Sequence, residues 1–92
     1  MRLVARAAAR ERIRERGGVL YVWPRPIRCC GGTVWSLEAS TERPDRELAL
    51  LHAEDGIAVY APPGLLRPRE LHVELERRER LAAYWNDQAL IG

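Results

Sequence analysis

The sequence predicts an α+β domain in which an N-terminal helix precedes a mainly antiparallel sheet, or a small β-sandwich, of about five strands. Three observations lead to this fold class. Residues 1–16 are rich in Ala, Arg and Glu, short β-branched and aromatic runs follow, and Gly or Pro turns separate those runs. The 92 residues are expected to form one domain, 1–92, with a core that must be economical at this length.

Residues 1–16 are expected to be helical because strong helix formers dominate them and a narrow apolar stripe runs along one side. Gly17 and Gly18 would end the helix, since glycine readily adopts the left-handed conformation of a C-cap. The first strand is expected at residues 19–23. It should stop at Pro24 and Pro26, which lack the backbone donors of a strand.

The second strand is expected at residues 33–39, where apolar and polar side chains alternate. Residues 48–51 are compatible with either a helical turn or a short strand. A further strand is expected at residues 56–60, between the Asp55-Gly56 turn and a Pro-Pro-Gly stop, and Leu65 and Leu66 are expected to pack as a plug. Alternation in residues 71–75 and 81–85, across a charged turn, predicts a terminal hairpin.

The net charge of +2 is unevenly distributed, because residues 1–16 contain six Arg and two Glu. Such a basic helix could contact nucleic acid or an acidic partner, but it lacks the interleaved aromatic residues that stack on bases. A solvated helix face is the simpler interpretation, and nucleic acid is not an expected partner. No apolar run approaches the length of a membrane span and no signal-peptide core follows the start, so a cytoplasmic location is expected.

The candidate site is the segment Arg28-Cys29-Cys30-Gly31-Gly32, which contains both cysteines of the chain. A thiolate can act as a soft metal ligand, a redox group or a nucleophile, and flanking glycines let the backbone fold closely around it. Arg28, together with Arg25, would favour the thiolate form. A disulfide between adjacent cysteines closes a strained ring, which predicts a transient bond at most.

A tetrahedral zinc or iron–sulfur site needs four ligands, and beyond Cys29 and Cys30 the sequence offers only the isolated His52 and His72 as further soft or borderline ligands. Both histidines are interpreted as solvent-facing or hydrogen-bonded residues. Two chains that meet at their thiol loops would supply four thiolates. The sequence therefore leaves open an iron–sulfur cluster or a thiolate-bound metal at the interface of a homodimer, with the identity of any cofactor unknown.

The order of these elements resembles the HesB-like, or A-type iron–sulfur carrier, family. The residues that carry the resemblance are 18–22 and 30–37, where Cys30, a following glycine, Trp35 and Leu37 match the family's loop cysteine and the start of its next strand. The resemblance implies a HesB-like fold and a role in binding an iron–sulfur cluster. The family's C-terminal cysteine pair has no counterpart in this chain.

The leading functional hypothesis is a non-enzymatic domain that uses Cys29 and Cys30 for iron–sulfur, metal or redox interaction. One alternative is a structural or protein-interaction module without thiol chemistry, in which the cysteines merely pack or lie exposed. Another is a thiol redox enzyme or sensor. Catalysis is not indicated otherwise, because the sequence has no phosphate-binding glycine motif and no Ser-His-acid pattern.

Overall fold

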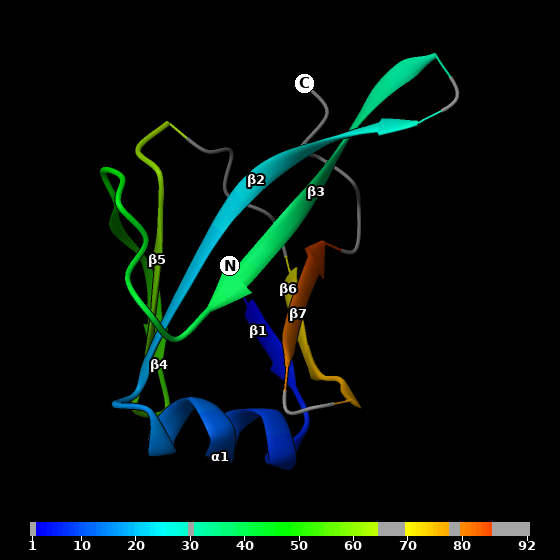
Figure 1. Ribbon diagram of the computed structural model, residues 1–92. Coiled ribbons are helices and arrows are strands. Elements are labelled where there is room, and N and C mark those ends of the chain that lie inside the picture. The colour runs from blue at the N-terminus through cyan, green and yellow to red at the C-terminus, as the bar shows by residue number, and fades with distance from the viewer. Residues whose placement is uncertain (1, 30, 65–69, 78–79, 86–92) are drawn as a thin grey trace.

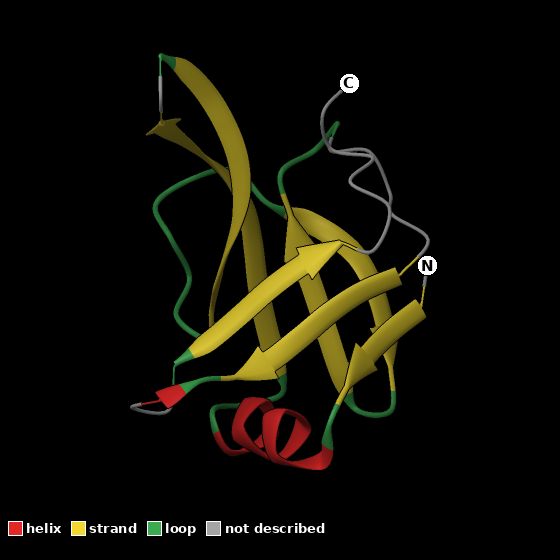
Figure 2. Ribbon diagram, turned by 90° about the vertical axis from the view of Figure 1, so that its right-hand side faces the viewer, coloured by secondary structure: helices red, strands yellow, loops and turns green. Residues whose placement is uncertain are grey.

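A computed structural model describes residues 2–29, 31–64, 70–77 and 80–85 of the chain. Its described part consists mostly of strands that form one seven-stranded sheet, which curls until it is nearly closed (Figure 2). The elements in chain order are β1 (Arg2–Ala5), α1 (Ala7–Glu15), β2 (Val19–Cys29), β3 (Gly32–Ser40), β4 (Ala49–Glu54), β5 (Ile57–Ala61), β6 (Glu70–Leu75) and β7 (Leu81–Trp85). The predicted five-stranded α+β fold of HesB-like type is therefore wrong.

The strands lie in the order β1-β6-β7-β3-β2-β5-β4. Most neighbours are antiparallel, but β1 pairs with β6 and β2 pairs with β5 in parallel. Parallel neighbours cannot be joined by a short turn, so these two pairs connect segments that are distant in sequence. They allow the sheet to curl around one core.

The core is aliphatic and fills the inside of the curled sheet. Helix α1 lies across one end of the sheet, below the strands in both views (Figures 1 and 2), and contributes the fully buried Ile13. The other fully buried large side chains come from three strands, β2, β5 and β6: Leu20, Val22, Ile57, Val59, Leu71 and Val73. Trp23, Tyr21 and Tyr60 are only partly buried, so the buried core formed by the described side chains is aliphatic.

Residues 2–5 form a strand rather than the first turn of the helix, which corrects the predicted N-terminal helix. Leu3 in β1 pairs with Leu71 in β6, and both side chains are buried. Ala, Arg and Leu are helix formers, but propensity is a weak preference that tertiary burial overrides. The helix begins after Arg6 and, as predicted, ends before Gly17 and Gly18.

Strand β2 continues through Pro24 and Pro26 to Cys29, whereas the sequence predicted that it ends at Trp23. Strand β5 pairs with β2 only as far as Tyr21, so the rest of that edge has no partner among the described strands. Residues two apart direct their backbone groups to the same side of a strand. The two missing donors therefore fall on the open edge, where proline is tolerated.

The remaining predictions can be compared directly. Strands at 33–39 and 56–60 and the terminal hairpin at 71–85 are confirmed as β3, β5 and the β6–β7 pair. Of the undecided segment at 48–51, residues 49–51 belong to strand β4, and Leu65 and Leu66 lie outside the described residues. Within the described ranges, no helix has the length and apolar character needed to cross a membrane.

Candidate functional site

The cysteine pair lies at the end of a long hairpin formed by β2 and β3. The two strands pair over nine positions, from Tyr21 opposite Ser40 to Cys29 opposite Gly32. Their other neighbours hold only the base of the hairpin, since β5 reaches Tyr21 and β7 pairs with β3 at Leu37. The outer part, residues 24–36, extends beyond the rest of the sheet as a two-stranded arm (Figures 1 and 2).

A two-residue bend, Cys30-Gly31, connects the strands at the tip of this arm, because Cys29 and Gly32 form the last pair. Gly31 has φ of 82°, a conformation that side chains rarely adopt, and this explains the glycine that follows the cysteines. Of the cysteines, the structure describes only the backbone of Cys29. Cys30 and the Cys29 side chain lie outside the described residues.

The predicted supporting residues surround this bend. Gly31 and Gly32 are exposed, and so are the side chains of Arg28 and Thr33, which face each other across the arm. Arg25 forms an ion pair with Glu38, which partly neutralises its charge. Arg28 has no ion pair within the described parts of the chain, so it is the arginine whose charge is available next to the cysteines.

His52 and His72, the other residues considered as ligands, do not approach the arm. His52 lies on β4, and its Nε2 is 2.6 Å from Oε1 of Glu54. His72 lies on β6, where its ring stacks on Tyr84 with a centroid separation of 5.2 Å. Neither strand pairs with β2 or β3, and among the described residues no group of three or more potential ligands could hold a metal ion.

Two arginines that sequence analysis did not select contact the base of the arm. The guanidinium of Arg46 lies 5.4 Å from the ring centroid of Trp23, and that of Arg43 lies 5.9 Å from the ring centroid of Tyr21. Both arginines come from the connection between β3 and β4, and cation–π contacts of this kind are attractive. They tie that connection to the outer face of β2 and help to position the arm. No local pattern in residues 41–48 indicates these partners.

The model of one protein family, described as the CC/Se motif containing family, matches residues 1–83. The match includes the whole arm and the only Cys-Cys pair of the chain. The expected resemblance to the HesB-like, A-type iron–sulfur carriers is wrong, because the family that matches is a different one. No curated protein and no solved structure matches the chain.

Proposed function

Because the chain belongs to the CC/Se motif containing family, we propose that Cys29 and Cys30 are its functional motif and that it acts as a non-enzymatic thiol module. The observation that carries this proposal is the position of the bend at the tip of an exposed arm. A reactive group at such a tip can reach the surface of another protein without any change in the core of its own domain.

Two features of the arm suit thiol chemistry. The exposed Arg28 precedes the pair, and a nearby positive charge favours a thiolate over a thiol. The exposed Gly31 and Gly32 leave the approach to the bend unobstructed by side chains of their own. The family is described by a CC/Se motif, and Cys29-Cys30 is the only Cys-Cys pair in this sequence.

The reaction that this arrangement supports best is exchange with a disulfide of a partner protein. One thiolate of the pair attacks a sulfur of that disulfide and forms a mixed disulfide, and the partner's other sulfur leaves as a thiolate. The second cysteine then attacks the mixed disulfide. The products are a Cys29–Cys30 disulfide and a partner dithiol, with two electrons and two protons transferred to the partner. The strain of the eight-membered ring makes this disulfide easy to reduce again.

The test uses oxidised glutathione as a model disulfide, followed by intact mass measurement. Because the chain has no other cysteine, every thiol-dependent change comes from this pair. We expect a product that is lighter by two hydrogens and remains monomeric in mass, and a stable glutathione adduct in the Cys29→Ser and Cys30→Ser variants. Adducts on both cysteines of the unmodified protein, with no internal disulfide, would contradict the proposal.

A soft metal ion or an iron–sulfur cluster shared by two copies is the second candidate. One chain offers two thiolates, and a homodimer that meets at its arm tips would offer four. Anaerobic reconstitution with iron and sulfide, followed by absorption spectroscopy and sedimentation, distinguishes it from exchange. A coloured dimer that is absent in the Cys29→Ser, Cys30→Ser variant supports the cluster, whereas a colourless monomer excludes it.

A protein-interaction module without thiol chemistry is the third candidate. A thiol redox enzyme or sensor is the fourth, and it would need a partner that serves as its substrate. An interaction module predicts that the double serine variant keeps its binding partner, whereas the thiol proposal predicts loss of the covalent partner. Thiol exchange requires reduced cysteines, and we therefore place the protein in the cytoplasm, where thiols are kept reduced.

A further inference from the structure

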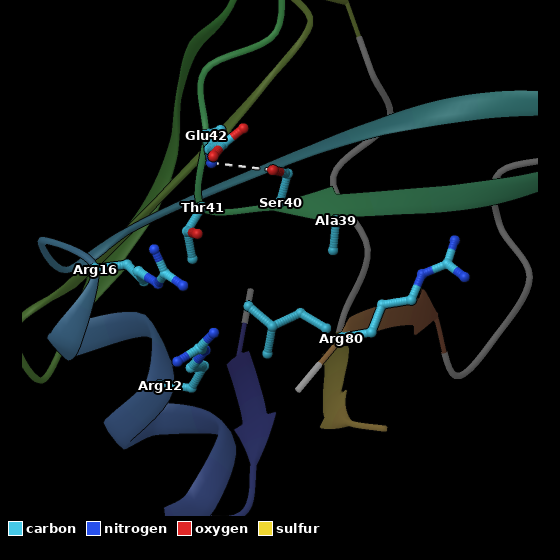
Figure 3. Close-up of a pocket in the computed structure, with 8 residues that line it drawn as sticks. Arg12, Arg16, Ala39, Ser40, Thr41, Glu42 and Arg80 are labelled. Carbon is cyan, nitrogen blue, oxygen red and sulfur yellow. Dashed lines mark hydrogen bonds between the residues drawn. The ribbon is translucent and has the colours of Figure 1, made fainter. Parts of the chain in front are cut away.

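A pocket of about 230 Å³ lies at the opposite end of β3 from the cysteine bend, between that strand, helix α1 and the start of β7 (Figure 3). Its lining combines basic side chains with hydroxyl groups. The lining residues are Arg12, Arg16, Ala39, Ser40, Thr41, Glu42, Arg80 and Leu81. Glu42 is the one acidic residue among them. The guanidinium groups of Arg12 and Arg16 lie together on the helix side, whereas the Arg80 side chain extends away from them (Figure 3).

Arg12 and Arg16 are four residues apart at the end of α1, and residues with this spacing lie on the same face of a helix. Figure 3 shows both guanidinium groups on the side of the pocket that faces Thr41. Arg12 also forms an ion pair with Glu15, in which Nη1 of Arg12 lies 3.8 Å from Oε2 of Glu15. Arg16 and Arg80 have no ion pair within the described ranges, which leaves their charges uncompensated by neighbouring carboxylates.

Of the two hydroxyl groups at the pocket, only that of Thr41 is on the side of the helix arginines (Figure 3). Ser40 Oγ accepts a hydrogen bond from the backbone N–H of Glu42 at 2.9 Å, and the Ser40 side chain lies on the opposite side of β3 from Ala39 (Figure 3). The Thr41 side chain points from the end of β3 towards the helix (Figure 3). The pocket thus presents donors from α1 and from Thr41, and two carboxylates, those of Glu15 and Glu42, lie near enough to compete with an anion.

We propose that this pocket binds a phosphate group, either as the free anion or as the terminal group of a small ester. Guanidinium groups bind phosphate oxygens through paired, charge-assisted hydrogen bonds, and hydroxyl groups complete such sites. The C-terminal end of a helix dipole repels an anion weakly, and this repulsion is smaller than the attraction of several guanidinium groups. The volume suits a phosphate-sized group better than a whole nucleotide, which needs a pocket of about 300 Å³ or more.

This site is separate from the proposed thiol site. Strand β3 runs from Gly32 at the bend to Ser40 at the pocket, a length of about 26 Å. Loss of the cysteines should therefore leave phosphate binding unchanged, and loss of the pocket arginines should leave disulfide exchange unchanged. The two proposals can fail independently.

The test is titration of the full chain with inorganic phosphate at constant ionic strength, followed by phosphorus NMR line width and by thermal unfolding. We expect saturable broadening and a rise in unfolding temperature. Arg16→Gln should weaken binding about tenfold, because it removes a charged donor. Thr41→Val removes one hydroxyl at nearly constant volume and should weaken binding about threefold. A parallel titration with glycerol 3-phosphate shows whether a free anion or an ester is preferred.

Arg6→Gln is the matched control, since it removes the same charge from the same end of the chain but does not line the pocket. It should bind phosphate as the unmodified protein does. Absence of saturable broadening in the unmodified protein would overturn the proposal. An equal loss in Arg6→Gln and Arg16→Gln would also overturn it, because that result indicates attraction by net charge alone. If Arg16→Gln does not fold, the Thr41→Val titration decides.

Discussion

The carboxylate of Glu54 accepts a hydrogen bond from the backbone N–H of Leu3, with Oε1 3.1 Å from the nitrogen. Glu54 lies on β4 and Leu3 on β1, which are the two edge strands of the sheet. Arg10 crosses the same seam, because its guanidinium donates to the carbonyl of Leu3 and contacts Asp55. Side chains thus bridge the gap where the curled sheet does not close by strand pairing.

Glu54→Gln should lower the free energy of unfolding at pH 7 by about 0.5 to 1 kcal/mol, because an amide keeps an acceptor but loses its charge. The hydrogen bond from His52 and then that from Leu3 lower the pKa of Glu54 below its ordinary value of 4.5. A depressed carboxyl pKa contributes stability above the unfolded pKa, and this contribution disappears as the pH falls through the folded pKa.

The difference in unfolding free energy between the unmodified protein and Glu54→Gln should therefore shrink from pH 6 to pH 3. Urea unfolding at a series of pH values measures it. Glu47→Gln, at an exposed position between β3 and β4, is the control and should show no such pH-dependent difference. A difference for Glu54→Gln that grows towards acid pH would contradict the role of the carboxylate at the seam.

Gly18→Ala should destabilise the fold by about 2 to 4 kcal/mol. Gly18 has φ of 78°, and a Cβ placed there would lie 2.8 Å from the backbone carbonyl oxygen of Gly56. Gly17→Ala is the matched control, since Gly17 also has positive φ but has no atom within 4 Å of the added carbon. Thermal or urea unfolding should show a clearly smaller loss for Gly17→Ala, and equal losses would refute the steric argument.

Pro26→Val should make the protein associate as its concentration rises. The substitution restores a backbone donor on the open edge of β2, and an unpaired strand edge is a template for pairing with another chain. Light scattering over a concentration series measures the effect. Thr33→Val is the control, because it adds similar apolar surface to the exposed arm without a new backbone donor. Equal association of both variants would attribute the effect to hydrophobicity.

Arg28→Gln should slow alkylation of the cysteines at pH 7 about twofold, since an exposed charge stabilises a neighbouring thiolate only modestly. Arg25→Gln should have a smaller effect, because Glu38 already partly neutralises Arg25. Iodoacetamide reaction rates, measured against pH for both variants, test this order. The opposite order would show that the charge beside the pair does not govern its reactivity.

The sequence alone determined the elements whose causes are local. The β6–β7 hairpin, the strand at 57–61 and the end of the helix before Gly17 all follow from alternation or turn residues within a few positions. It also singled out the Cys-Cys bend, because Gly31 marks a turn between two strands.

Only the tertiary structure decided that residues 2–5 form a strand, that β2 extends through two prolines, and that the sheet curls until Glu54 meets Leu3. The strand at residues 2–5 and the contact between Glu54 and Leu3 depend on partners more than forty residues away. The course of β2 through its prolines depends on an edge that has no partner among the described strands. Local preferences do not encode such pairings, because burial against distant strands outweighs the small free-energy differences between helix and strand propensities. The same non-local pairing leaves the cysteine bend on a projecting arm.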